Sequence, residues 1–305
     1  MKPPARIMHP SPTTRRRFLR DGSIWLAGLS GLSGGIAVSA DAKASLLRLG
    51  LITDLHYADK DPKGTRHYRE TLAKLEEAGR FFADQRISLV AELGDFIDAA
   101  DSVDTELGYL RRIQSAFAPI ATERIHVLGN HCVDTLTKQE FLGETGQERS
   151  YFSLDRGGVH LVVLDACFRS DGTPYGRKNF DWKDANLPPE ELEWLESDLA
   201  GAQGPAIVLA HQRLDRDDVH TVRNAPAVRA ILERSGKVAA VFQGHSHQND
   251  LVDLGGIHYV TLRAMVEGSG AENNGYGLVE VFSGGGIRLL PGRLQRAYDS
   301  TRSEA

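Results

Sequence analysis

The chain has 305 residues, of which 41% are hydrophobic and 25% charged, and its formal net charge is −5 at pH 7. This composition is that of a soluble globular protein, and the length allows one large domain or two small ones. The acidic balance excludes a surface that follows a nucleic-acid polymer, because such binding needs clustered positive charge. Cys132 and Cys167 are the two cysteines, and a core of this size needs no disulfide, so their pairing is left open.

The first forty residues differ in composition from the rest of the chain. A basic stretch, TTRRRFLRDG, precedes the weakly apolar, glycine-rich run SIWLAGLSGLSGGIAVSA, which ends in small side chains. This is the layout of a cleavable export signal, and residues 14–20 (TRRRFLR) resemble the twin-arginine motif. The alternative is a membrane anchor or a basic tail, but the run is short and rich in glycine for a spanning helix.

We therefore expect residues 1–40 to be a twin-arginine signal peptide, cleaved after Ala40, Ala42 or Ala44. The expected partner is the twin-arginine translocation machinery, and the expected location is periplasmic or secreted in a bacterium, without stable membrane insertion of the mature chain. Cleavage after Ala40 removes six of the 36 Lys and Arg and one of the 41 Asp and Glu, which leaves a net charge near −10. An anionic substrate would then need a local positive centre, which a pair of metal ions supplies.

From residue 46 onward, strand-like and helix-like apolar patterns alternate. The predicted strands are residues 46–54, 87–95, 124–130, 205–211 and 237–245, and residues 151–166 predict a hairpin that turns at Gly157 and Gly158. The predicted helices are residues 66–85, 101–117, 188–202 and 224–236. Short strand candidates fill residues 250–290. This order predicts one α/β domain with a layered sheet core.

Residues 238–250, VAAVFQGHSHQND, place two histidines just after a predicted buried strand. Gly244 lets the backbone turn sharply at the strand end. If the segment after it is extended, alternation puts His245 and His247 on the same side, where both face one site. The alternative for this motif alone is a loop with two solvated histidines.

Polar residues that can bind a metal follow each of the main predicted strands. They are Asp54 and His56, then Asp95, then Asn130 and His131, then His211, and finally His245 and His247. Because the carboxyl ends of parallel strands lie together, we expect these side chains to converge at one edge. Each has a simpler interpretation alone, such as a helix cap or a turn residue, but a chance alignment of all five sets is improbable. Carboxylate, amide and imidazole donors without thiolate suit Mn, Fe or Zn.

This order of motifs, D-x-H, G-D, G-N-H, H and G-H-x-H, resembles that of the calcineurin-like metallophosphoesterases over residues 46–292. The resemblance implies a four-layer αββα sandwich in a single domain, which we place at residues 45–295 with a C-terminal tail at 296–305. It also implies two divalent metal ions, Mn, Fe or Zn. One would be bound by Asp54, His56 and His247, the other by Asn130, His211 and His245.

Two further roles follow from the same resemblance. Asp95 would bridge the two ions, and His131 would be a catalytic residue that assists the leaving oxygen without binding metal. A metal pair clamps the attacking and leaving oxygens of a displacement at phosphorus and makes hydroxide available near neutral pH. The residue after G-N-H is commonly acidic in this family, where it can orient the histidine, and here it is Cys132. We therefore expect another acid to hold His131, or its pKa to be lower.

Within the family, the chain resembles the branch of manganese-dependent ADP-ribose/CDP-alcohol diphosphatases. The residues that carry this likeness are Tyr57-Ala58-Asp59, Arg66-His67-Tyr68-Arg69, Leu164-Asp165, Leu192-Glu193-Trp194-Leu195 and Asn224. Arg66 and Arg69 are candidate phosphate ligands, although an exposed arginine at a helix start is the simpler interpretation.

The long irregular segment at residues 169–186 is expected to overhang the site. Its Tyr175, Phe180 and Trp182 are candidates to stack on a base or sugar of the substrate. The competing interpretation is that these aromatic side chains pin the loop to the core.

The sequence thus predicts an exported, dinuclear-metal phosphoesterase that hydrolyses a phosphomonoester or a nucleotide-type diphosphate, with a small phosphorylated substrate. One alternative is a phosphodiesterase acting on lipid head groups or cyclic nucleotides. Another is a non-catalytic metal-binding protein of the same fold, which only the departure at Cys132 favours. The metal pair, the exact substrate and the oligomeric state are left open, because specificity lies in the loops.

Overall fold

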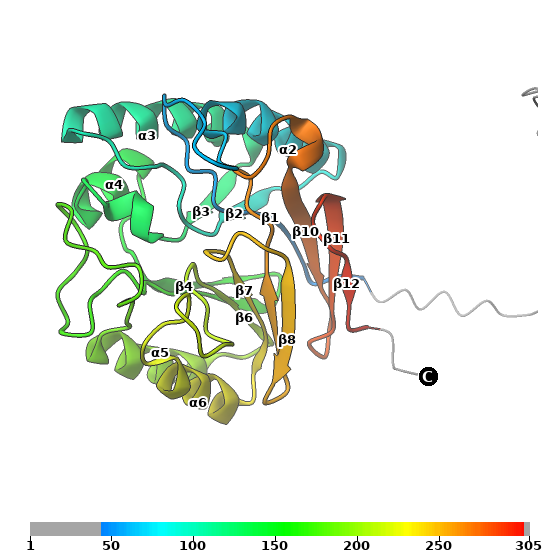
Figure 1. Ribbon diagram of the computed structural model, residues 1–305. Helices are drawn as coiled ribbons and strands as arrows, with labels where there is room; N and C mark the ends of the chain where they lie inside the picture. Colours follow the sequence, from blue (N-terminus) through cyan, green and yellow to red (C-terminus); the bar gives the residue numbers. More distant parts are fainter. Residues whose placement is uncertain (1–43, 302–305) are drawn as a thin grey trace, which may run out of the picture. The chain divides into compact units, whose positions relative to one another are not determined.

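A computed structural model of the protein describes residues 44–301 (Figure 1). The predicted signal peptide, residues 1–40, lies outside this part of the chain. None of the helices among the described residues is long and apolar enough to cross a membrane.

Two mixed sheets of six strands each form the centre of the domain. The first has the order β12-β11-β10-β1-β2-β3, and the second has the order β4-β5-β6-β7-β9-β8. In the first sheet, β1, β2 and β3 run parallel, and in the second β5, β6, β7 and β9 run parallel. The strands are β1 (Leu47–Ile52), β2 (Leu89–Glu92), β3 (Glu123–His126), β4 (Phe152–Arg156), β5 (Val159–Val163), β6 (Ala206–Leu209), β7 (Val238–Gln243), β8 (Asp250–Leu254), β9 (Ile257–Thr261), β10 (Gly275–Val281), β11 (Ile287–Arg293) and β12 (Tyr298–Asp299).

Helices cover the outer face of each sheet. They are α2 (Thr71–Asp84), α3 (Val103–Phe117) and α4 (Lys138–Thr145) on the side of the first sheet, and α5 (Pro189–Gly201) and α6 (Ala225–Ser235) on the side of the second (Figure 1). Three hydrophobic cores match this order of layers. Along β1, Leu49 and Leu51 pack between the two sheets, whereas Ile52 faces the helices of the first sheet. The third core joins the second sheet to α5 and α6. The predicted four-layer αββα sandwich is confirmed.

The predicted helices and strands are present, with small shifts of their ends. The hairpin turns at Gly157 and Gly158 as predicted, and α3 begins after Ser102, whose side chain accepts a hydrogen bond from the Thr105 backbone N–H. The first predicted helix, residues 66–85, begins later, with a 3₁₀ turn at Tyr68–Glu70 before α2.

Two features were missed in the sequence. Helix α4 lies in a stretch for which no helix was predicted, although Thr137 and Glu140 form a capping box there. The first sheet also continues past the predicted domain end at residue 295, because β12 pairs with β11. Residues 296–301 therefore belong to the domain and not to a separate tail.

Candidate metal centre

The loops that leave the carboxyl ends of the parallel strands meet between the two sheets. Asp54, Asp95 and Asn130 follow β1, β2 and β3 of the first sheet, whereas His211 and His245 follow β6 and β7 of the second. The predicted convergence of strand ends is thus present, but it joins two sheets and not one. The group of candidate metal-binding residues is therefore complete only when the two sheets pack together.

Many of these residues have a left-handed backbone conformation. The positive φ values are 52° at Asp54, 45° at His56, 52° at Asp95, 68° at His245 and 63° at His247. Such conformations cost about 1–3 kcal/mol for a non-glycine residue and concentrate at functional sites. The extended conformation predicted for His245 and His247 is therefore wrong. Their side chains reach one site because each residue makes a tight left-handed turn.

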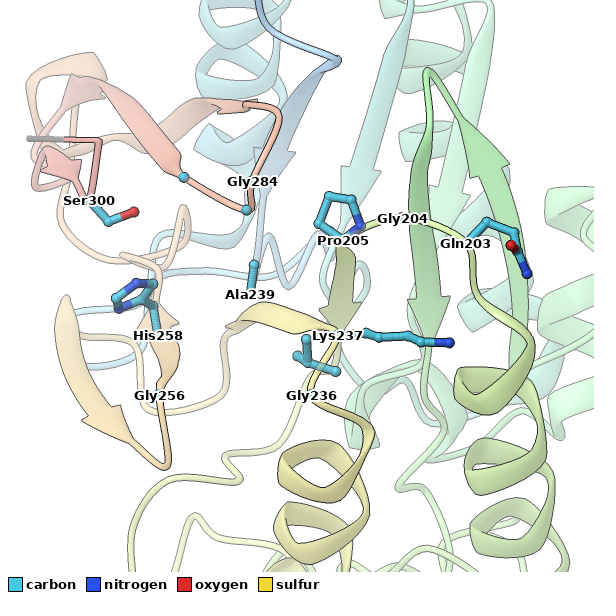
Figure 2. A pocket seen from close by; sticks show the side chains of 13 residues that line it. Gln203, Gly204, Pro205, Gly236, Lys237, Ala239, Gly256, His258, Gly284 and Ser300 are labelled. Carbon is cyan, nitrogen blue, oxygen red and sulfur yellow. The ribbon is translucent and has the colours of Figure 1, made fainter.

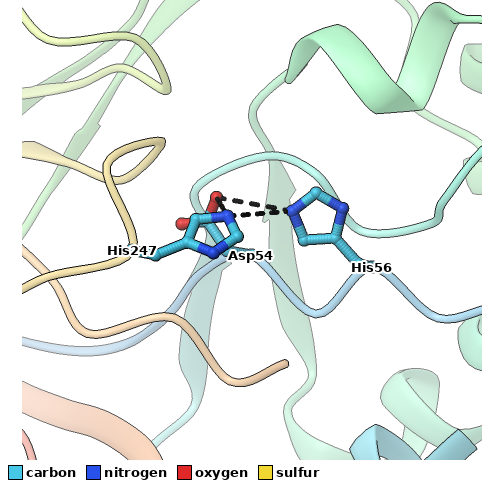
Figure 3. Close-up of side chains that lie close together, drawn as sticks. All are labelled: Asp54, His56 and His247. Carbon is cyan, nitrogen blue, oxygen red and sulfur yellow. Dashed lines mark hydrogen bonds and ion pairs between the residues drawn. The ribbon is translucent and has the colours of Figure 1, made fainter. Parts of the chain in front are cut away.

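Asp54, His56 and His247 form the first cluster (Figure 3). His56 Nε2 lies 3.2 Å from His247 Nε2, and His247 Nε2 lies 3.4 Å from Asp54 Oδ1. Asp54 and His56 are fully buried. Two imidazole nitrogens and a carboxylate oxygen at these distances enclose a position suited to a cation.

Asp95, His211 and His245 form the second cluster, and Asn130 lies beside it. His211 Nε2 lies 3.2 Å from His245 Nδ1 and 3.2 Å from Asp95 Oδ2. Asn130 Oδ1 is buried and finds no hydrogen-bond partner among residues 44–301. An unpaired buried amide oxygen is costly, so it indicates a ligand that the protein atoms do not provide.

Asp95 connects the two clusters. Its Oδ2 lies 3.5 Å from His56 Nε2 in the first cluster and 3.2 Å from His211 Nε2 in the second. Its other oxygen, Oδ1, accepts a hydrogen bond from the His131 backbone N–H at 2.7 Å. Asp95 therefore lies between the two clusters, and the bridging role that the resemblance implies for it stays a prediction.

Two glycines of the motifs are required by close packing. A Cβ on Gly129 would lie 2.3 Å from the Asp95 backbone nitrogen, and one on Gly94 would lie 2.5 Å from His211 Nδ1. Gly94 also has a φ of 97°. Neither position tolerates a side chain without moving a residue of the centre.

The two clusters share one pattern of protonation in the ion-free protein. Burial opposes charge on His211, but Asp95 raises its pKa to about 9, and Asp54 together with Glu267 does the same for His247. Burial lowers the pKa of His56 to about 4. Burial alone would raise the pKa of Asp54 and Asp95, but the neighbouring histidines lower both. The carboxylates are therefore ionised, and His211 and His247 carry a proton at neutral pH.

Asp98 supplies the acid that the sequence did not locate for His131. It lies three residues after Asp95, and its Oδ2 is 3.7 Å from His131 Nδ1 and 3.1 Å from His56 Nδ1. Lys60 Nζ donates a hydrogen bond to its other oxygen at 2.8 Å. Cys132 is instead fully buried, accepts a hydrogen bond from the Phe96 N–H, and has a pKa raised by burial. Both cysteines are free thiols.

Glu267 is a second residue that the motifs did not reveal. Its Oε1 lies 2.7 Å from His247 Nδ1, on a loop that follows β9. Lys74 holds this loop, because its buried ammonium group donates hydrogen bonds to the carbonyls of Met265, Glu267 and Gly268. Carboxylates on the outer nitrogen of a ligating histidine set its tautomer and orientation.

A small cavity of about 180 Å³ opens over both clusters. Its lining comprises Arg66, Asp95, Asn130, His131, Trp182, His220, His245 and His247. Of the predicted substrate residues, Arg66 and Trp182 line it, whereas Arg69 and Tyr175 do not. Arg69 is exposed and bonds to Asp59 and Asp61, and Tyr175 is buried, where its hydroxyl donates to the Asp181 carbonyl.

A different cavity, of about 710 Å³, lies at the amino ends of the second sheet's parallel strands (Figure 2). Its polar side chains already have protein partners. Lys237 Nζ donates to the carbonyls of Leu199, Ala200 and Ala202, and His258 Nδ1 lies 2.6 Å from Asp253 Oδ1. The larger cavity therefore lacks an unpaired polar side-chain atom like Asn130 Oδ1, which marks the smaller cavity.

The donors at the carboxyl end fit a pair of divalent ions. Each cluster combines imidazole nitrogen with carboxylate oxygen, Asn130 adds an unpaired amide oxygen, and Asp95 serves both. This is a borderline-to-hard donor set, suited to Mn, Fe or Zn.

Comparison with known proteins gives a consistent result. The family model described as calcineurin-like phosphoesterase matches residues 47–249. A manganese-dependent ADP-ribose/CDP-alcohol diphosphatase from Arabidopsis thaliana is 24% identical over 74% of this chain and 88% of its own length. The protein of that name from Danio rerio is 22% identical over 72% of this chain and 87% of its own.

Among solved structures, a dimetal phosphatase from Danio rerio superposes with a TM-score of 0.73 and 18% identity. The match covers 84% of this chain and 99% of that one. The family match supports a phosphoester hydrolase that uses two divalent metal ions. The chain is therefore a member of the calcineurin-like phosphoesterase family.

Proposed function

We propose that this protein hydrolyses a nucleotide-type diphosphate or a phosphomonoester at the two clusters joined by Asp95. The observation that carries the proposal is the shared carboxylate: Asp95 Oδ2 lies within 3.5 Å of a histidine in each cluster. The names of the two relatives, ADP-ribose/CDP-alcohol diphosphatases, favour the diphosphate. All seven predicted metal ligands are residues that can bind a divalent ion, which argues against a non-catalytic protein of the same fold.

The donors are assigned to the ions as the motifs predict. Asp54, His56 and His247 would hold one ion, Asn130, His211 and His245 would hold the other, and Asp95 would serve both. When bound, the ions supply Lewis acidity toward the phosphoryl oxygens and toward water. The protein contributes the spacing of the donors and their strained, preorganised loops.

His131 protonates the departing oxygen in this proposal. Its Nδ1 faces Asp98, which leaves Nε2 for the substrate, and the ring lines the cavity. A carboxylate beside Nδ1 orients the ring so that Nε2 faces the substrate, which is the position that a general acid requires. Asp98 thereby takes the orienting role that an acid at position 132 would have.

Arg66 binds a phosphate oxygen of the substrate. Its backbone is held by hydrogen bonds in both directions with Lys63, at 3.1 Å each, and by a bridge to Glu267. Its guanidinium lies 3.7 Å from Asp98 Oδ2 and lines the cavity. Arginine suits this role because its planar group matches phosphate oxygens.

The experiment that tests the proposal is hydrolysis of a four-member panel with added Mn: p-nitrophenyl phosphate, bis-p-nitrophenyl phosphate, ADP-ribose and CDP-choline. Wild type and Asp95→Asn are compared at equal Mn. We expect Mn-dependent turnover in the wild type, greatest for a diphosphate, and a loss of about 10³-fold or more in the variant. Turnover that survives in Asp95→Asn contradicts the proposed site, and a preference for bis-p-nitrophenyl phosphate points to a phosphodiesterase.

We also propose that residues 1–40 direct the protein to the periplasm or outside a bacterial cell through the twin-arginine route. Support comes from the basic motif at residues 14–20 and the short apolar run after it. Replacing Arg15 and Arg16 together by Lys in the full chain is expected to retain the protein in the cytoplasm on cell fractionation. Unchanged export of that variant would contradict the assignment.

A further inference from the structure

The three aromatic residues of the 169–186 loop have different surroundings. Tyr175 is 2% exposed and lies in the core, and Phe180 packs against the same core. Trp182, in contrast, keeps 37% of its surface exposed and lines the cavity over the metal centre. Tyr175 and Phe180 therefore pin the loop to the domain, while Trp182 is presented to whatever enters the cavity.

The loop that carries Trp182 is held firmly. The Lys178 ammonium donates a hydrogen bond to the Ala100 carbonyl, and Arg177 donates to the Thr135 carbonyl and to Glu140. The loop ends are joined by a bridge between Cys167 and Asn186. Trp182 is thus a fixed feature of the cavity, which lowers the entropy cost of a stacking contact.

His220 faces Trp182 from a separate loop, after β6. The two ring centroids are 5.5 Å apart, and each ring also lies near His245, at 6.2 Å for Trp182 and 5.6 Å for His220. Two hydrogen bonds hold the backbone at His220. The Arg213 N–H donates to the His220 carbonyl, and the His220 N–H donates to the Asp218 carboxylate. Two separate loops thereby place their rings side by side above one cluster.

The aromatic pair lies above the second cluster, whereas Arg66 belongs to the surroundings of the first. Arg66 lies close to Asp98 and its charge acts on His247, whereas Trp182 and His220 lie close to His245. The cavity therefore has one wall that suits a phosphate and one that suits a planar ring. Lys183 Nζ lies 5.1 Å from the centre of the Trp182 ring and adds a cation beside it.

We propose that Trp182 and His220 form an aromatic wall that binds a planar ring of the substrate and so selects nucleotide-type substrates over phosphoesters without a ring. This inference rests on the proposed function and assigns its specificity to two residues. The cavity of about 180 Å³ is smaller than the roughly 300–1,000 Å³ of sites that enclose a drug-sized ligand. The metal centre thus accommodates the phosphoryl group, and the ring lies at the rim against Trp182.

The test compares two diphosphates, ADP-ribose and P1,P2-dimethyl diphosphate, which has no ring. Both are assayed with Mn for wild type, Trp182→Ala, Trp182→Phe and His220→Ala. We expect Trp182→Ala to lower kcat/KM for ADP-ribose roughly 5- to 150-fold, chiefly through KM, because loss of base stacking has that size. Dimethyl diphosphate is expected to change less than about twofold, His220→Ala to have a smaller effect of the same kind, and Trp182→Phe to restore most of the loss.

Val219→Ala is the matched control, because Val219 is exposed, apolar and adjacent to His220 but does not line this cavity. It is expected to behave as wild type. An equal loss of kcat/KM for both substrates in Trp182→Ala would mean that Trp182 supports the metal centre. That result would contradict the proposed aromatic wall. An unchanged KM for ADP-ribose would overturn it as well.

A separate measurement distinguishes failure of the wall from failure of the proposed function. AMP is titrated by calorimetry into Mn-loaded wild type and Trp182→Ala, which requires no turnover. Weaker AMP binding by the variant supports the wall even if neither diphosphate is hydrolysed, a result that would reject only the proposed function. Equal AMP affinity in the two proteins contradicts the wall whatever the activity.

Discussion

Both ends of the parallel strands carry a cavity bordered by loops, but the two ends differ in how their polar groups are paired. At the amino end, Lys237 and His258 are bonded to carbonyls and to Asp253. At the carboxyl end, Asn130 Oδ1 is buried without a protein partner, and imidazole nitrogens face one another at 3.2 Å. The amino-end cavity is about four times larger, yet the smaller one holds the chemistry. Buried polar atoms without a partner therefore identify a functional site better than the volume of a cavity does.

The largest difference in activity is expected when one glycine at each end of the parallel strands is replaced by alanine. Gly129→Ala places a Cβ 2.3 Å from the Asp95 backbone nitrogen, whereas the nearest atom to a Cβ at Gly286 is the Thr301 methyl group, at 3.2 Å. We expect Gly129→Ala to lower Mn-dependent turnover about 10²-fold, because it displaces the bridging carboxylate. Its free energy of unfolding is expected to fall by about 1–3 kcal/mol in thermal denaturation.

Gly286→Ala is expected to keep its activity within about twofold and its stability within about 0.5 kcal/mol. Equal loss of activity in the two variants would remove the functional distinction between the two ends.

A second contrast uses two carboxylate–histidine pairs of similar geometry. Glu267 Oε1 lies 2.7 Å from His247 Nδ1 at the carboxyl end, and Asp253 Oδ1 lies 2.6 Å from His258 Nδ1 at the amino end. Glu267→Gln is expected to weaken Mn affinity about 10- to 100-fold, because the carboxylate orients a metal-binding imidazole. Asp253→Asn is expected to leave Mn affinity unchanged, and calorimetric titration of Mn into both variants checks this. A normal affinity in Glu267→Gln would show that His247 needs no such support.

The third contrast concerns protons. Asp95 and Asp54 raise the pKa of His211 and His247 to about 9, so each carries a proton at pH 7.5 in the ion-free protein. An ion must displace that proton, and apparent Mn affinity is therefore expected to rise about tenfold per pH unit per ion up to about pH 9. The same raised pKa values stabilise the ion-free fold fully below about pH 6.5, and this contribution is lost as the pH rises through about 9.

Calorimetry of Mn binding in buffers of different ionisation enthalpy measures the proton release directly. About one proton per ion is expected at pH 7.5, and release of none would show that both imidazoles are already neutral.

Much of the centre could be predicted because polar residues at strand ends must meet when the strands are parallel. The strand patterns before Asp54, Asp95 and His211 are apolar and unambiguous, and the glycines of the motifs mark close packing. The sequence did not reveal the left-handed turns at His245 and His247, because φ depends on what the loop packs against. It also did not reveal which of two loop arginines would line the cavity.

The supporting residues were harder to predict for a related reason. Glu267 reaches His247 only because Lys74, almost 200 positions earlier, binds the carbonyls of its loop. Asp98 follows the Asp95 of the G-D motif by three residues, so its place near the metal centre could have been predicted. Its contact with His131 could not, because no sequence pattern indicates the direction of its side chain. Long-range contacts of this kind have no periodic signal. The capping box of α4, in contrast, is a local signal, because Thr137 is followed three residues later by Glu140.

The number of Mn ions bound per chain tests the central claim most directly. Metal-stripped wild type and Asn130→Ala are equilibrated with Mn, and bound metal is counted alongside the electron paramagnetic resonance spectrum, which is sensitive to two Mn ions in contact. We expect two coupled ions in the wild type and a weakened second ion in the variant, because Asn130 Oδ1 is the unpaired buried donor of the second cluster. A single ion in the wild type, or two ions without coupling, would contradict a centre built around Asp95.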